Sequence, residues 1–323
     1  MSSISHRTIL HYQAHITPKN ENYAGVAPPP MRRCLGSLSN LRHKKEALVT
    51  YLKGGETFYV ADVKLDFPVT DWATLLINLS DKTEPDPAFS VPETQGYRVE
   101  RKRQKEGIAS SCHIVVSLTP QVNRQDLYRF FIEQRVKMPA AKIQRVLNRL
   151  LFIASKKDKN LFLAPDPSGA VDSKGEPKQI FIRPHIELLG DPSDQFIHDV
   201  ENGSLSNVEM VKISAVTPWD GNGYLNMDRE TLRLMPTQSV GAFRQVYDTI
   251  CSVGKKRDFS QAKVVFTTSS KMQRSVTIDT STGALAFENY YVRRSQISNF
   301  PTLLESSYEL IHNPISTKMQ QLA

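Results

Sequence analysis

Short apolar runs separated by polar turns dominate the first part of the chain. Residues 7–16, 57–67 and 72–80, and the run that starts at His113, have the length and composition of β-strands. A loop follows the first of these runs because Pro28, Pro29 and Pro30 fit no regular element. Sequential strands with short connections predict an antiparallel meander.

Three helices are predicted up to residue 159. Residues 38–52 place Leu41, Leu48, Val49 and Leu52 at helical spacing, and residues 123–134 begin with Asn123, a favourable N-cap. The most regular pattern covers residues 138–159, where one wide apolar stripe faces a core. Four cations of this helix share a second face, roughly 145° from the stripe, and so project together into solvent: Lys142, Arg145, Arg149 and Lys156.

Phe152 lies beside this basic row rather than in the apolar stripe. An aromatic side chain in that position either packs on a neighbouring part of the protein, or stays exposed to stack on a base or anchor a partner.

The second half of the chain mixes both kinds of element. Helices are predicted over residues 191–203 and 239–258, and strands over residues 179–190, 208–214, 231–235, 262–268, 274–280 and 284–294. The pattern as a whole predicts an α+β protein with two lobes. Residues 1–135 form a lobe rich in antiparallel strands, and residues 136–323 form an α+β lobe that begins with the basic helix.

The positive charge of the chain is concentrated in one region. The formal net charge is +8, and residues 97–159 contain fifteen Lys and Arg against five Asp and Glu. A regional excess of cations suits a polyanion-binding face, because neutralised phosphates release counterions. A solvated basic face without a ligand is the alternative.

The stretch from Tyr97 to Leu118 begins with five cations in nine residues and ends in an apolar strand. Residues 107–111 predict a joint that lets a mobile basic hairpin leave the sheet. Together with the basic helix, this hairpin predicts weakly sequence-specific, salt-dependent phosphate contacts to double-stranded DNA, with RNA still open. The predicted contact residues are Arg98, Arg101, Lys102, Arg103, Lys105, Lys142, Arg145, Arg149 and Lys156.

Two partial templates leave a phosphodiester-cleaving enzyme open as an alternative. His15 and His113 resemble the paired H-x-[ST] motifs of two-histidine phosphoesterases; Thr17 fits the first motif, but Val115 replaces the second hydroxyl. The second template is a nuclease metal site, for which the candidate residues are Glu56, Asp62, Lys64, Asp81, Glu84 and Asp86. No complete catalytic motif is present, so the sequence predicts no catalytic residue, metal or cofactor. A module that binds an acidic protein is a third possibility.

The remaining composition indicates a cytoplasmic protein. No apolar stretch is long enough to span a bilayer, and the first ten residues lack the apolar core of a signal peptide. Cys34, Cys112 and Cys251 are far apart and odd in number, which predicts reduced structural thiols.

The order of elements resembles that of DNA-binding phage-exclusion and defence proteins of the lambda Rex and Kiwa type. The resemblance covers a strand-rich N-terminal lobe, a basic middle, and a C-terminal lobe in which residues 242–258 lead into a strand and the late hairpin of residues 274–294. It implies a soluble, cytosolic protein that binds DNA without base specificity and works with a membrane-protein partner. The resemblance does not assign a function to any individual residue of this sequence. A homo-oligomer that encloses a duplex is a further expectation.

Overall fold

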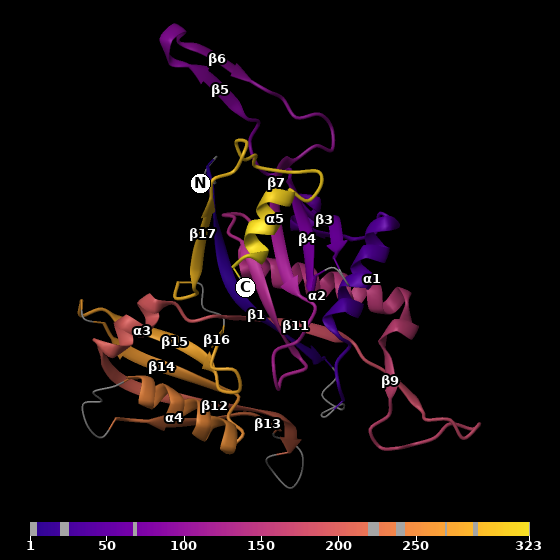
Figure 1. Ribbon diagram of the computed structural model, residues 1–323, viewed down its shortest axis with the longest axis vertical. Coiled ribbons are helices and arrows are strands. Elements are labelled where there is room, and N and C mark those ends of the chain that lie inside the picture. Colours follow the sequence, from indigo (N-terminus) through magenta and orange to yellow (C-terminus); the bar gives the residue numbers. More distant parts are fainter. Residues whose placement is uncertain are drawn as a thin grey trace. The chain divides into compact units, whose positions relative to one another are not determined.

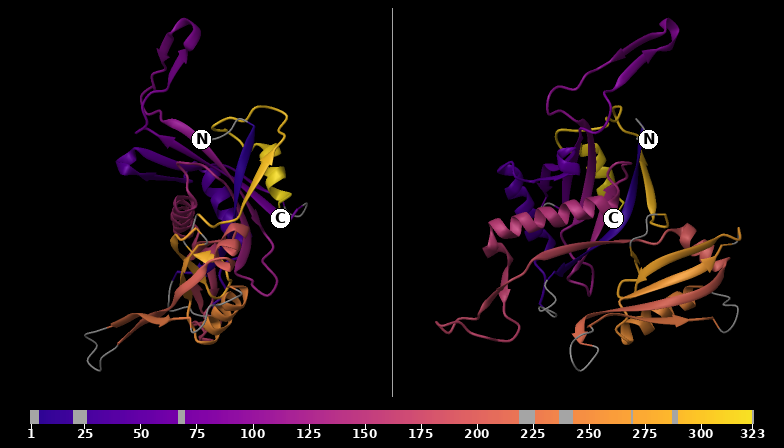
Figure 2. Two further views of the ribbon diagram at one scale, coloured as in Figure 1. Left: turned by 90° about the vertical axis from the view of Figure 1, so that its left-hand side faces the viewer. Right: turned by 180° about the vertical axis from the view of Figure 1, so that it is seen from behind.

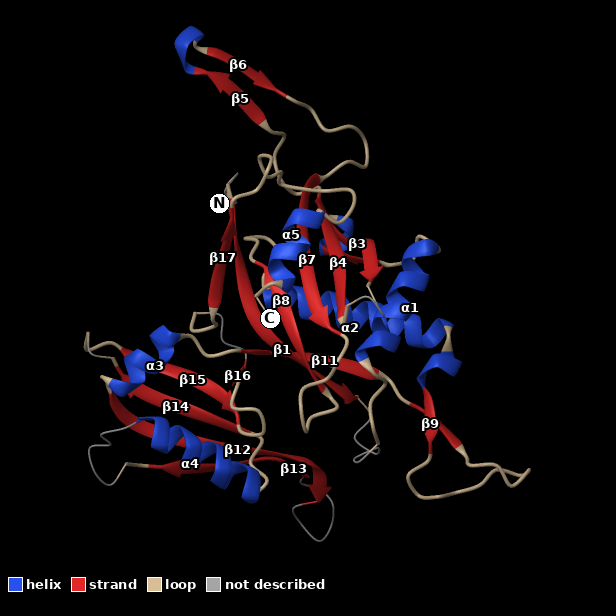
Figure 3. Cartoon of the chain, viewed as in Figure 1, coloured by secondary structure: helices blue, strands red, loops and turns tan. Residues whose placement is uncertain are grey.

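The computed structural model describes residues 5–19, 26–66, 70–218, 226–236, 243–268, 270–286 and 290–322. Residues 239–242 of one predicted helix and 287–289 of the last predicted strand lie outside these ranges. The described chain is α+β, with mostly antiparallel strands (Figures 1 and 3). Its contacts define two compact units. Unit 1 comprises residues 1–9, 16–187 and 295–323, and unit 2 comprises residues 10–15 and 188–294.

This division differs from the predicted boundary between residues 135 and 136. The basic helix belongs to unit 1 with the N-terminal strands, and the last residues of the chain return to the same unit. Periodicity identifies elements, but which elements share a core depends on packing between distant segments.

A twisted antiparallel sheet forms the centre of unit 1. Its strands are arranged in the order β17 (Arg294–Ser298), β1 (His6–Pro18), β8 (Leu127–Glu133), β7 (Ile108–Ser117), β4 (Trp72–Asp81), β3 (Glu56–Leu65) and β2 (Leu48–Tyr51). The predicted strands at residues 7–16 and 72–80 and the strand through His113 are thereby confirmed, and the strand predicted at residues 57–67 is confirmed as far as Leu65, with residue 67 outside the described ranges. β4 and β7 pair over their full length, from Trp72 opposite Ser117 to Asp81 opposite Ile108.

Helices cover this sheet. α1 (Met31–His43) and α2 (Ala140–Lys157) pack on each other, α1 also on β3 and α2 also on β2. α5 (Asn313–Gln320) packs on β7 through a cluster that includes Val115, Ile315 and Met319. The neighbour of Val115 along the strand, Ile114, is also fully buried, so the central strands are buried on both faces.

Two predicted helices need correction. Residues 127–133 form strand β8, which lies between β1 and β7 and has six of its seven residues buried. A short apolar run fits a buried strand as well as a buried helix, and here strand pairing decided between them. In residues 38–52 the helix starts earlier, directly after Pro30, and ends at His43, and Leu48–Tyr51 form the edge strand β2.

Two hairpins contribute no strand to the main sheet. β5 (Ala88–Val91) pairs with β6 (Gly96–Val99), and β9 (Leu163–Pro165) pairs with β10 (Gln179–Phe181). The β5–β6 hairpin stands clear of the unit 1 sheet in each view (Figures 1 and 2).

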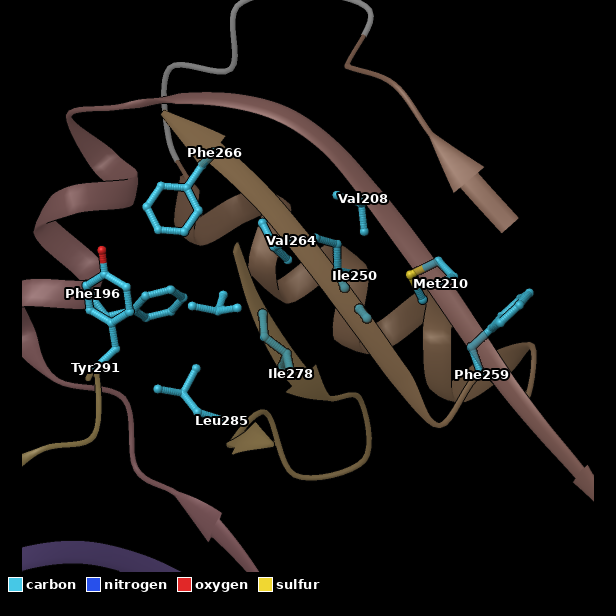
Figure 4. Packing of buried hydrophobic residues seen from close by; sticks show 12 residues of the cluster. Phe196, Val208, Met210, Ile250, Phe259, Val264, Phe266, Ile278, Leu285 and Tyr291 are labelled. Atoms are coloured by element: carbon cyan, nitrogen blue, oxygen red, sulfur yellow. The ribbon is translucent and has the colours of Figure 1, made fainter. Parts of the chain in front are cut away.

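Unit 2 packs two helices on antiparallel strands. Its strands are β13 (Asn226–Leu234), β12 (Ser204–Pro218), β14 (Gln261–Thr267), β15 (Gln273–Asp279) and β16 (Leu285–Ala286), followed by the last residues of β11 (Pro184–Gly190). The helices are α3 (Asp194–Glu201), capped by the Ser193 hydroxyl, and α4 (Phe243–Lys256). Twelve buried residues form the core, with Phe196, Phe266 and Tyr291 at one end (Figure 4).

β15 and β16 form a hairpin, as expected for the strands predicted at residues 274–280 and 284–294, and residues 281–283 lie in the turn between them. Gly283 has a φ of 72°, a conformation that glycine adopts without strain. Both helices predicted in the second half are present, with α3 and α4 inside the predicted ranges.

Candidate nucleic-acid interface

The basic face of helix α2 is present and gains a residue from outside the helix. Arg145, Arg149 and Lys156 are exposed, as the helical spacing predicts. The end of Arg183, just before β11, lies 4.1 Å from the centre of the Phe152 ring. The same ring lies 5.2 Å from the guanidinium of Arg149 and 4.4 Å from the ammonium of Lys156. One half-buried aromatic ring therefore gathers three cations.

A pair of hydrogen bonds fixes β11 beside α2 and so places Arg183. The Asn148 side chain donates to the Ile186 carbonyl at 2.7 Å and accepts from the Ile186 N–H at 2.8 Å. Such a pair satisfies both backbone groups of Ile186 and determines the register of β11 relative to the helix. The Lys19 N–H also donates to the Arg183 carbonyl at 2.9 Å, which brings another exposed lysine to this side of unit 1.

Tyr51 of the edge strand borders the same face. Burial raises the pKa of its hydroxyl, and the nearby charges of Arg145 and Arg149 oppose this rise. At the other end of this face, burial and the charges of Lys19 and Arg183 lower the pKa of His185.

We call Arg145, Arg149, Phe152, Lys156 and Arg183 the basic–aromatic face. Among the described residues, no carboxylate forms an ion pair with any of its four cations.

Lys142 does not belong to this face, although helical spacing predicts it there. Its ammonium lies 2.7 Å from a carboxylate oxygen of Glu56 and 5.0 Å from the centre of the Phe58 ring. A half-buried ion pair of this kind already neutralises the lysine, so a phosphate would have to compete with Glu56. The predicted projection of Lys142 into solvent is therefore wrong, and its contact with nucleic acid stays a prediction.

The predicted basic hairpin is only partly basic. Arg98 pairs with Glu100 at 3.1 Å and lies over the Phe89 ring. Lys102 bonds to the carbonyls of Lys82 and Glu84 and lies 3.9 Å from Asp86. The other three predicted cations are exposed, and within the described ranges no carboxylate pairs with their side chains: Arg101, Arg103 and Lys105.

The predicted joint at residues 107–111 is also wrong. Ile108–Ser111 already pair with β4, and the Ser111 hydroxyl is buried between Asn78 and Ser307. A Cβ at Gly107 would lie 2.7 Å from the backbone nitrogen of Asp81. Glycine is therefore needed at this position for a close backbone approach, and residues 82–87 and 100–106 connect the hairpin to the sheet instead.

His113 belongs to a buried ionic network. The ring is fully buried, its Nδ1 lies 2.7 Å from Glu133, and its Nε2 accepts the backbone N–H of His312 at 3.1 Å. Because Nε2 is an acceptor, Nδ1 carries the proton and donates it to the carboxylate. Glu133 also pairs with Arg7 at 2.7 Å. Both nitrogens of His113 are used internally, so this histidine cannot exchange a proton with a substrate.

The C-terminal segment closes this network. Arg7 donates to the carbonyl of Glu305 and Arg135 to that of Ser306. Burial alone would raise the pKa of Glu133, but the hydrogen bond from His113 and the charge of Arg135 lower it. The network therefore binds the backbone of the C-terminal segment to strands β1 and β7 and to Arg135. The two-histidine template therefore fails at His113, whatever the role of His15.

The acidic residues of the nuclease template are each held by neighbours. Asp62 pairs with Arg42 at 3.3 Å and accepts the Ile311 N–H, and Lys64 pairs with Asp66. Asp81 and Glu84 both contact Lys137. In the part of the chain that the structure describes, no group of three acidic, histidine or cysteine side chains could hold a metal ion.

Arg183 is not among the predicted contact residues, although the sequence contains a signal for it. From Ile180 to Ile186 the even-numbered residues are buried, and Phe181, Arg183 and His185 are half-buried. This alternation places Arg183 on the less buried face of an extended segment. The alternation does not show that this face lies beside Phe152 of α2.

Comparison with models of known protein families gives no match, and comparison with curated proteins gives no significant match. Within the described ranges, no helix is long and apolar enough to cross a lipid bilayer. The three cysteines are free thiols, and Cys34 and Cys112 are buried.

Proposed function

We propose that the protein binds double-stranded DNA through phosphate contacts made by the basic–aromatic face. The observation that carries this proposal is the gathering of Arg149, Lys156 and Arg183 around Phe152 without a compensating carboxylate among the described residues. Cations held close together repel one another, and such an arrangement is favourable when an anionic ligand neutralises it.

The length of the face suits a polyanion. Arg145 and Lys156 are eleven positions apart on α2, which corresponds to about 16 Å along the helix axis. A duplex carries a phosphate charge about every 1.7 Å of its axis, so several phosphates fall within reach of the row. A single small phosphorylated ligand would engage only part of it.

The contacts of Phe152 favour a duplex over a single strand. Single-stranded nucleic acids bind largely by stacking bases on exposed aromatic rings. The Phe152 ring is half-buried and already contacts three cations of the protein, so a base would have to displace them. Phosphate contacts from arginine and lysine read no base edges, so binding should be weakly sequence-specific.

The exposed cations that follow the β5–β6 hairpin, Arg101, Arg103 and Lys105, are a secondary contact region in this proposal. A role in phage defence or exclusion, with a membrane-protein partner, rests on the resemblance in the order of elements.

Competition experiments test the proposal directly. Fluorescence polarisation of a short labelled duplex should show binding at low salt, and unlabelled duplexes of unrelated sequence should compete equally. Single strands of the same sequence should compete less well, because stacking contributes little. Polyglutamate separates this function from recognition of an acidic protein: equal competition by polyglutamate, or no duplex binding at low salt, would contradict DNA binding.

A further inference from the structure

The β5–β6 hairpin exposes apolar side chains on both faces. Phe89 is 50% exposed, Val91 52%, Tyr97 72% and Val99 46%. An isolated two-stranded ribbon is marginally stable in water, and it gains stability from a third strand or a packed face. This hairpin is part of unit 1 but has neither of these within the described chain (Figure 2).

The hydrogen-bond pattern shows which backbone groups of the hairpin are open. The Glu100 N–H donates to the Pro87 carbonyl at 2.9 Å, and the strand register continues from Ala88 opposite Val99. Hydrogen-bonded and non-bonded pairs alternate in an antiparallel ladder. The backbone groups of residues 96, 98 and 100 therefore point toward β5, and those of Tyr97, Val99 and Arg101 point to the free edge.

The two edges of the ribbon differ. On the β5 side, Pro92 follows the strand immediately and has no N–H to donate, so only Ala88 and Ser90 offer open backbone groups. The β6 side has no proline, and its open backbone groups continue from Tyr97 to Arg101. A strand added to this hairpin would therefore pair with β6.

The sequence of β6 is complementary to itself in one register. Antiparallel pairing centred on Val99 places Val99 opposite itself in a hydrogen-bonded pair, with Arg98 opposite Glu100 of the other strand. The Arg98–Glu100 positions are then non-bonded pairs, in which side chains lie closest, and each carries opposite charges. A register centred on Arg98 would use the same open backbone groups, with Tyr97 opposite Val99, but it would place the two Arg98 side chains opposite each other in a non-bonded pair, where like charges repel.

We propose that β6 pairs antiparallel with β6 of a second copy of this chain, centred on Val99, to form a four-stranded ribbon. Tyr97 lies opposite Arg101 in this register and covers part of the apolar surface. The interface is small, so self-association should depend on protein concentration.

Charge exchange across the pair gives the sharpest test. In R98E both paired positions are acidic, and in E100R both are basic, so each variant should self-associate about tenfold more weakly than the wild type. An equimolar mixture of the two variants restores opposite charges at all four positions and should associate as a heterodimer. Sedimentation velocity measures the self-association of the wild type, of each variant and of the mixture. Circular dichroism checks that the exposed substitutions leave the fold intact.

Disulfide trapping tests the register. Residues of a hydrogen-bonded pair have Cα atoms about 5.5 Å apart, within the range that a disulfide spans. Val99→Cys should therefore form covalent dimers under mild oxidation, whereas Ser90→Cys on the β5 edge should not. Three outcomes overturn the proposal: a wild type that is monomeric at all concentrations, a mixture that does not associate, or charge variants that lose duplex affinity without losing self-association. The last would assign the hairpin to nucleic acid instead.

Discussion

The salt dependence of DNA affinity is the most informative prediction for the basic–aromatic face. Each cation that neutralises a phosphate adds about −0.9 to the slope of log affinity against log salt concentration. The four cations Arg145, Arg149, Lys156 and Arg183 therefore give a slope of about −3.6. With that slope, affinity falls about 150-fold between about 50 and 200 mM salt.

The triple variant R145A/R149A/R183A removes three of these contacts. Its slope should be shallower than that of the wild type by about 2.7. Contacts from Arg101, Arg103 and Lys105 add equally to both proteins, so the difference between the two slopes isolates the face. Fluorescence polarisation titrations of one labelled duplex at four or more salt concentrations give both slopes.

A matched control removes the same charge elsewhere. Lys255, Lys256 and Arg257 are exposed at the end of α4 in unit 2. K255A/K256A/R257A has the same net charge as the face variant and should retain the wild-type slope. A slope difference below about 1 for the face variant would refute local phosphate contacts at this face. So would an equal change in the control, which would indicate a general effect of net charge.

Three further predictions concern single residues. Phe152→Leu keeps an apolar side chain but loses the ring that gathers three cations, so duplex affinity should fall a few-fold with an unchanged salt slope, measured by the same titration. Glu133→Gln leaves buried Arg7 and Arg135 without their counter-charge and should lower the free energy of unfolding by about 3–5 kcal/mol in urea titrations, whereas the exposed Glu100→Gln should cost less than about 1 kcal/mol. Burial and the charge of Arg293 lower the pKa of His11 to about 4. Because the unfolded chain binds this proton first, stability should fall as pH decreases from about 6.5 toward 4, by up to about 3 kcal/mol, and less in His11→Gln; equal pH dependence in both proteins would contradict the role of His11.

Several features follow from the sequence by itself. The helix at α2 and the direction of Arg145, Arg149 and Lys156 depend only on helical geometry, so the spacing predicted them correctly. Strands β1, β3, β4 and β7 follow from short apolar runs and from the positions of proline. The same local rules failed for residues 127–133, because the strand conformation there depends on pairing with β1 and β7 on either side.

The tertiary structure alone decided which distant residues meet. Arg183 reaches Phe152 because Asn148 bonds to Ile186, 38 positions away, and Lys142 leaves the face because it meets Glu56, 86 positions away. His113 loses its access to solvent through His312, 199 positions away. Backbone preferences and side-chain direction are local properties that a sequence pattern records. The neutralisation or burial of a charge depends on contacts between distant segments, which only the packed chain determines.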